Sequence, residues 1–352
     1  MWPGSRGRTV ADLAASDPRI AWWAPQPVDR SRDEVRLDRF PAAAAQVLAG
    51  QIGPLANLRS APGCGCAVDT DSPWIELRLS RLRHHQMVAQ SVALEIEQGG
   101  RRWSVDSGDL REREGDVVIR LPTGLERGGA LGTVWCWLPP ISTCAVAGLT
   151  LAEGAAVGPA RLPEPRLLAL GDSLVQGFSC ASPLHTWAHR LWRRTGLAAW
   201  NLGVGGIRIE PEVFRWALES RTWDIVVIGL GSNHAWRASD VETAADQAAA
   251  LAEIALAGGH RRVVWGLPPW KPCEDGKGPP DFMQVPLDRD TGDRLRAVRA
   301  ALRDRLAAYG PALALLDDPM PHDARWYPDG LHPFAPGFAR YEAAIAAALG
   351  LE

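Results

Sequence analysis

Residues 167–174 read Leu-Leu-Ala-Leu-Gly-Asp-Ser-Leu, and this stretch predicts the architecture of the C-terminal half. The four apolar residues are typical of a strand buried on both faces, and helical spacing follows over residues 183–194. A serine at the end of a parallel strand, just before a helix, has its hydroxyl at the open sheet edge where α/β folds bind ligands. Ser173 is therefore a candidate nucleophile, although Gly, Asp and Ser also build plain turns.

The alternation of strand and helix continues to the C-terminus. Near-continuous apolar runs predict further buried strands, and an apolar stripe at helical spacing marks the clearest helices. The predicted strands are residues 198–202, 225–229, 263–267 and 312–316, and the predicted helices are residues 238–257 and 292–309. This pattern predicts a parallel sheet between two layers of helices, a three-layer α/β/α fold.

The N-terminal half has a period of two instead. Short alternating strands without intervening helices indicate an antiparallel β-sandwich. The predicted strands are residues 75–79, 92–96, 117–121, 134–138 and 145–151, with a possible strand at 35–40 and a short helix at 42–49. Residues 154–165 are rich in Gly and Pro, and we predict that they form a linker. We therefore expect two domains, residues 1–160 and 161–352.

Composition narrows the class of partner. The chain has 352 residues, 46% of them hydrophobic, and a formal net charge of −3. It contains no basic stripe, which argues against nucleic acid and anionic membranes as partners. The N-terminus has no apolar signal-peptide region and no run is long enough to span a bilayer, so we expect a cytoplasmic protein. The six cysteines match no zinc spacing, so no metal is predicted. The 16 tryptophans are expected in the core or on a substrate wall.

Three further segments lie at the same predicted sheet edge or before the last helix. Residues 201–206 (Asn-Leu-Gly-Val-Gly-Gly) offer backbone N–H donors, as an oxyanion site needs, but also suit a flexible turn. Asn233 could donate to an oxyanion or cap the next helix. Asp329 and His332 are three apart, so in a tight turn the carboxylate can reach Nδ1 of the imidazole and hold Nε2 toward a serine.

Together these blocks resemble the SGNH hydrolases, also called GDSL esterases. Gly171-Asp172-Ser173-Leu174, residues 201–206, Gly231-Ser232-Asn233 and Asp329-Gly330-Leu331-His332 occur in the family's order. The resemblance implies a flavodoxin-like fold with Ser173 as nucleophile, His332 as base and Asp329 as the orienting acid. It also implies an oxyanion hole from Gly206, Asn233 and the backbone N–H of Ser173. Where the family's third block usually reads Gly-x-Asn-Asp, this chain has His234.

The N-terminal half is similar to a two-domain subgroup in which a jelly-roll-like β-sandwich precedes the SGNH domain. This subgroup includes carbohydrate deacetylases and a polyketide-pathway acyltransferase, and residues 71–77 (Asp-Ser-Pro-Trp-Ile-Glu-Leu) suggest it. We expect the sandwich to pack beside Ser173 and form one side of the substrate site. Trp270, on a stiff loop after the fourth strand, and His234 are the predicted substrate-binding residues.

The resulting hypothesis is a serine esterase that hydrolyses an acetyl or other short-acyl ester of a sugar or small molecule. The mechanism requires no cofactor, and none is predicted. One alternative is an acyltransferase, in which a bound hydroxyl replaces water. A second alternative is a glycan-binding protein with a vestigial catalytic half, which the intact serine, asparagine and Asp/His set argues against.

Overall fold

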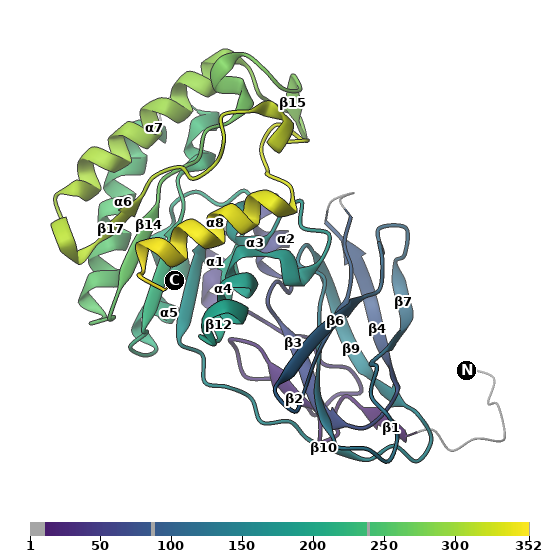
Figure 1. The fold of residues 1–352 in the computed structure, drawn as a ribbon. Coiled ribbons are helices and arrows are strands. Elements are labelled where there is room, and N and C mark those ends of the chain that lie inside the picture. The colour runs from purple at the N-terminus through teal and green to yellow at the C-terminus, as the bar shows by residue number, and fades with distance from the viewer. Residues whose placement is uncertain (1–10, 86–88, 238–239, 352) are drawn as a thin grey trace.

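The computed structural model describes residues 11–85, 89–237 and 240–351. Antiparallel sheets form the N-terminal half and a parallel sheet with helices forms the C-terminal half (Figure 1). No helix in the described part of the chain is both long and apolar enough to cross a bilayer.

The parallel sheet has five strands in the order β12-β11-β13-β14-β17. Numbered along the chain this is 2-1-3-4-5, the flavodoxin-like order. The strands match the five predicted positions: β11 (Leu167–Gly171), β12 (Ala199–Gly203), β13 (Ile225–Gly229), β14 (Val263–Gly266) and β17 (Ala314–Leu316). The order reverses between β11 and β13, and crevices for ligands form at such a switch point.

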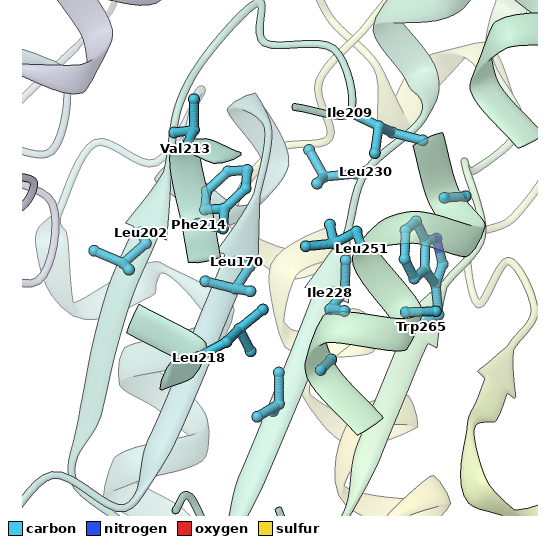
Figure 2. Close-up of a cluster of buried hydrophobic side chains, with 14 of the residues drawn as sticks. Leu170, Leu202, Ile209, Val213, Phe214, Leu218, Ile228, Leu230, Leu251 and Trp265 are labelled. Carbon is cyan, nitrogen blue, oxygen red and sulfur yellow. The ribbon is translucent and has the colours of Figure 1, made fainter. Parts of the chain in front are cut away.

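Both faces of this sheet are buried, because successive strand residues point to opposite sides. Leu170 of β11 packs on one face with Phe214 and Leu218 of α5, as Figure 2 shows. Leu168 belongs to the same buried cluster. Leu167 on the other face packs with side chains of α4 and α8. The three-layer α/β/α architecture is thus confirmed.

The helices predicted over 183–194, 238–257 and 292–309 lie close to those positions, with residues 238–239 outside the described part of the chain. Predicted helix 183–194 is a 3-10 turn (Pro183–His185) followed by α4, with extended Thr186 capping α4 through its hydroxyl. The helices are α3 (Ser173–Gln176), α4 (Trp187–Thr195), α5 (Pro211–Glu219), α6 (Asp240–Ala257), α7 (Arg289–Ala307) and α8 (Ala335–Ala348). Short 3-10 helices also lie at Ser232–Trp236, Pro272–Asp275, Gly310–Ala312 and Ala324–Trp326, and a hairpin pairs β15 (Asp281–Phe282) with β16 (Val285–Pro286).

The N-terminal half contains two antiparallel sheets around one apolar core. One has the order β1-β9-β4-β7, and the other has the order β10-β3-β8-β5-β6 with β2 paired to β3. Their strands are β1 (Ala11–Ala14), β2 (Ala21–Trp23), β3 (Gly65–Thr70), β4 (Trp74–His84), β5 (Ala93–Gln98), β6 (Arg101–Asp106), β7 (Gly115–Pro122), β8 (Gly132–Trp137), β9 (Ser142–Leu151) and β10 (Val157–Pro159). The predicted sandwich strands are all present.

One local prediction for the N-terminal half is wrong, and the predicted linker contains a short strand. Residues 35–40 form only one bridge, from Val35 to Val146, because Leu37 packs in the sandwich core while Phe40 turns into the core of the other half. The predicted linker 154–165 is not wholly irregular, since β10 pairs with β3. The division into domains 1–160 and 161–352 stays a prediction.

A short helical segment of the N-terminal half packs on the parallel-sheet half. It comprises α1 (Ala42–Val47), where a helix is predicted, and α2 (Ile52–Leu58). Ala44, Leu48 and Leu58 are buried in the same cluster as Leu202 and Phe214. Elsewhere Trp23, Trp135 and Trp137 of the sandwich pack with Leu184 and Trp192. The two halves therefore share apolar contacts at two separate places.

Candidate active site

Ser173 is the first residue of α3 and follows strand β11, which ends at Gly171, after one intervening residue. The preceding Asp172 caps this helix, because its Oδ1 accepts a hydrogen bond from the N–H of Leu174 at 3.0 Å. Asp172 is buried, and burial raises the pKa of its carboxyl against the opposing effects of the Leu174 N–H and the Lys271 ammonium. The strand and the cap together fix the backbone of Ser173 at the sheet edge.

His332 and Asp329 meet Ser173 from the loop before α8. Nε2 of His332 lies 2.8 Å from Oγ of Ser173, and Nδ1 lies 2.7 Å from Oδ2 of Asp329. The other carboxylate oxygen of Asp329 accepts the backbone N–H groups of Leu331 (2.9 Å) and His332 (2.7 Å). The three predicted residues therefore form one continuous hydrogen-bonded chain, with the carboxylate orienting the imidazole toward the serine.

The surroundings of this chain keep Asp329 ionised and hold the imidazole in place. Burial alone would raise the pKa of Asp329, but the hydrogen bonds and charge of His332 outweigh it and lower the pKa to about 2. The His332 ring is buried and packs near Phe178 and Phe282, with ring centroids 5.0 and 5.3 Å away. Packing from two sides limits rotation of the imidazole.

Backbone donors lie on the same cavity wall as Ser173. Gly206, in the turn after β12, lines the cavity and has φ of +80°, a conformation that favours glycine. Its neighbour Gly205 has no room for a side chain, because a Cβ there would lie 2.6 Å from the Phe178 ring. Among the described residues, no protein acceptor takes the backbone N–H of Ser173 or Gly206. Both are free to donate to an oxyanion.

Asn233 also lines the cavity, from the 3-10 helix Ser232–Trp236 after β13. Its Nδ2 donates to the carbonyl of Ile207 at 2.8 Å, and its Oδ1 accepts the indole N–H of Trp236 at 3.0 Å. An amide nitrogen carries two hydrogens, so these bonds orient the side chain and leave one N–H for a ligand. Asn233 does not cap α6, which begins seven residues later.

A cavity of about 480 Å³ opens at Ser173, and both halves of the chain line it. The N-terminal half contributes α2 residues and the side chains of Arg83, His84 and His85 at the end of β4. Burial lowers the pKa of His85 to about 4. The prediction that the N-terminal half forms one side of this cavity is confirmed.

Buried polar residues of the N-terminal half hold the glycine-rich loop in place. Arg39 is 1% exposed and donates to the carbonyls of Asn201 (3.1 Å) and Gly203 (2.8 Å). Asn57 donates to the carbonyl of Gly205 at 3.0 Å. Burial lowers the pKa of Arg39 to about 9, so the guanidinium stays charged at neutral pH. These contacts join residues more than 140 positions apart, and no local sequence pattern indicates them.

Lys271 is a second residue that sequence reasoning missed. It is 3% exposed and lines the cavity, and its Nζ donates to the carbonyl of Leu331, next to His332. Burial lowers the pKa of Lys271, against the charges of Asp172, Asp329 and Asp318. An ammonium at this position stabilises all three carboxylates. The sequence signal is a lysine on a stiff loop at the sheet edge, but the sequence does not distinguish Lys271 from the neighbouring Trp270 as the residue that lines the cavity.

The structure places the two predicted substrate-binding residues away from the cavity wall. Trp270 is 3% exposed, donates its backbone N–H to Asp318 and stacks on His322 with ring centroids 5.2 Å apart. His234 is 1% exposed, and its Nε2 accepts the backbone N–H of Ile209 at 3.0 Å. The His234 side chain thus holds the segment at Ile209, and the Trp270 ring packs on the loop at His322.

Solved structures of similar fold contain both halves. A salicylyl-acyltransferase from a tetracycline biosynthetic pathway is 19% identical, with 98% of this chain and 99% of that chain covered and a TM-score of 0.75. A GDSL-like lipase structure from Bacteroides ovatus is 14% identical with the same coverages and a TM-score of 0.76. A family two carbohydrate esterase from Clostridium thermocellum is 12% identical, with 95% of this chain and 100% of that chain covered and a TM-score of 0.60.

At these identities the likeness establishes the two-part fold and not a shared substrate. No curated protein sequence gives a match. The sequence of residues 169–340 matches the profile of one family, and this range contains Ser173, Gly206, Asn233, Asp329 and His332. The family that residues 169–340 match is the GDSL-like lipase/acylhydrolase family.

Proposed function

We propose that the protein is a serine esterase that cleaves an ester through an acyl-enzyme on Ser173. The observation that carries this proposal is the chain from Ser173 Oγ to His332 Nε2 (2.8 Å) and from His332 Nδ1 to Asp329 (2.7 Å), at the wall of a cavity. A serine hydroxyl is a weak nucleophile unless an adjacent base removes its proton, and this geometry supplies the base and its orienting carboxylate.

In the first half-reaction, Oγ of Ser173 attacks the ester carbonyl as its proton passes to Nε2 of His332. The oxyanion accepts hydrogen bonds from the N–H groups of Ser173 and Gly206 and from Nδ2 of Asn233. Collapse of the tetrahedral intermediate breaks the bond to the alcohol oxygen, which takes the proton from His332. The alcohol leaves, and the acyl group remains on Ser173.

In the second half-reaction, His332 takes a proton from water as the water oxygen attacks the acyl-enzyme. The bond to Oγ breaks, Ser173 regains its proton, and a carboxylic acid is released. An alcohol bound in place of water would give an acyltransferase by the same steps. These residues support both outcomes, so the acceptor must be identified by experiment. The hydrogen-bonded triad, with its buried imidazole, argues against a purely glycan-binding role.

The test is steady-state kinetics with p-nitrophenyl esters, for the wild-type protein and for Ser173→Ala. We expect turnover by the wild type and a loss of several orders of magnitude in the variant, with an unchanged melting temperature. Rates measured with and without small alcohols, with product analysis, then separate hydrolysis from acyl transfer. Equal activity in the two proteins would overturn the proposal.

A further inference from the structure

Two exposed apolar side chains lie at the cavity that contains Ser173. Ile52, at the start of α2, is 86% exposed, and Met283, between β15 and β16, is 62% exposed. Among the described residues they are the large apolar side chains with the greatest exposure. They are 231 positions apart in the sequence and line the same cavity. Apolar side chains kept in water beside a pocket are typical of a binding surface.

The turn that presents Met283 is conformationally unfavourable. The hairpin has a two-residue loop, Met283 and Gln284, with φ of +51° and +67°, closed by the pair Phe282 and Val285. Positive φ at both central residues is the requirement of a type I′ turn, which strongly prefers Asn-Gly. Methionine and glutamine both have a Cβ that disfavours this region. Unfavourable backbone conformations of this kind gather at functional sites, where the side chain's position matters.

Both sides of the cavity mouth are held rigidly relative to Ser173. Beside Met283, the Phe282 ring packs 5.3 Å from the His332 ring, and Leu287 is buried against Leu331. On the other side, Asn57 of α2 donates to the carbonyl of Gly205. Ile52 and Met283 are therefore fixed on elements that contact the base and the glycine-rich loop.

The cavity behind these two residues is also mainly apolar. Leu174, Phe178, Trp236 and Leu331 contribute to its wall. Several polar side chains on the wall are already bonded within the protein: His84 to Ser142 (2.7 Å) and Leu110 (2.9 Å), Asn57 to Gly205, and Lys271 to Leu331. A sugar ring buried here would lose water from its hydroxyls with few partners in return. An apolar group would not incur this cost.

We infer that Ile52 and Met283 form an apolar rim that binds the hydrocarbon part of the substrate, and that the substrate is an ester with an apolar group of several carbons rather than an acetylated sugar. This inference rests on the proposed function. Each methylene buried against the rim raises kcat/KM about fourfold until the apolar surface is filled. The apolar group belongs to the acyl chain or to the alcohol, and the two arms of the experiment distinguish these sources.

The first arm compares p-nitrophenyl acetate, butyrate and hexanoate, and the second compares acetate esters of ethanol, butanol and hexanol. The readout is the ratio of kcat/KM between the longest and the shortest ester. We expect this ratio to exceed ten in one arm for the wild type and to fall about fivefold in Ile52→Ser and in Met283→Gly. Leu131→Ser is the matched control, because Leu131 is 46% exposed and does not line the cavity.

Met283→Gly also separates binding from a structural role. Glycine relieves the unfavourable φ, so the variant should melt at a higher temperature while its preference for long esters declines. A higher melting temperature with an unchanged ratio would overturn the inference, as would a wild type that prefers acetate or acetylated sugars.

A binding measurement on Ser173→Ala makes failure of the inference distinguishable from failure of the proposed function. Calorimetry should show that the preferred six-carbon ester, the hexanoate or the hexyl acetate, binds Ser173→Ala more tightly than its two-carbon homologue. Adding Met283→Gly to Ser173→Ala should remove most of this difference in affinity. Equal affinities would overturn the inference even with normal wild-type turnover. Tight, rim-dependent binding without turnover would instead overturn the proposed function.

Discussion

The guanidinium of Arg39 donates a hydrogen bond to the carbonyl oxygen of Gly203 over 2.8 Å, although the two residues are 164 positions apart. Gly203 ends β12 and begins the turn that contains Gly206. The backbone position of Gly206, a proposed oxyanion donor, thus depends on a buried charge from the N-terminal half. That half therefore holds the glycine-rich loop in addition to lining the cavity.

Replacing Arg39 by Met should destabilise the whole protein. Its guanidinium donates to five buried backbone carbonyls, and loss of the donor leaves these acceptors unsatisfied. We expect the free energy of unfolding in urea to fall by about 3–5 kcal/mol. Arg36→Met is the control, because Arg36 is exposed and its ion pair in the described part of the chain is with Asp38. Similar unfolding curves for both variants would contradict this role.

Replacing Asn233 by Ala should lower kcat about a hundredfold, because one oxyanion donor is removed. The Ile207 carbonyl and the Trp236 indole also lose a partner, so a lower melting temperature is expected in addition. Stopped-flow kinetics and thermal melts on the same preparation measure both effects. Normal kcat in a destabilised variant would limit Asn233 to a structural role.

Lys271→Met should lower kcat about tenfold or more by loosening the loop that holds His332. The substitution also removes the positive charge that opposes protonation of the buried Asp172 and the half-buried Asp329, so the acid limb of the activity profile should move to higher pH. Lys277→Met provides a matched control, since Lys277 is the other lysine of the chain and is exposed. An unaltered pH profile in Lys271→Met would refute the electrostatic part.

His234 should make stability, and not activity, depend on pH. Burial lowers the pKa of His234 from 6.5 to about 4, so between these values the unfolded chain binds a proton that the folded protein does not. Stability is then complete above pH 6.5 and falls as the pH decreases toward 4, by roughly 2–3 kcal/mol. In His234→Gln this loss should be smaller by that amount, while His85, whose pKa burial also lowers to about 4, keeps its own contribution. Urea unfolding at several pH values tests it, and parallel curves for the two proteins would contradict it.

Local patterns predicted the parts of this site that lie next to their strands. Ser173, Gly206 and Asn233 each follow a parallel strand of the same sheet, so the strand pattern alone brings them to one edge. Asp329 and His332 are three residues apart, which allows their contact within a single turn. Strand periodicity and the spacing within one turn are local properties of the sequence, so these five positions could be predicted from it.

Contacts between distant segments could not be predicted in this way. Arg39 and Asn57 reach the glycine-rich loop only because α1 and α2 pack on the parallel-sheet half, and nothing in residues 39–57 indicates a partner there. Trp270 and Lys271 are neighbours, and the sequence does not reveal which side chain turns to the cavity. A chain starting near Pro163 would lack Arg39 and the buried Phe40 and Leu48, so the parallel-sheet half depends on contacts that its own sequence does not contain.

The most direct test of the serine mechanism is covalent labelling with a fluorophosphonate probe, followed by intact mass measurement and peptide mapping. The reagent reports on a serine whose hydroxyl is activated by a neighbouring base. We predict one adduct per chain, located on Ser173, with labelling lost in Ser173→Ala and slowed strongly in His332→Ala. An adduct on any other residue, or none on the folded wild-type protein, would contradict the account.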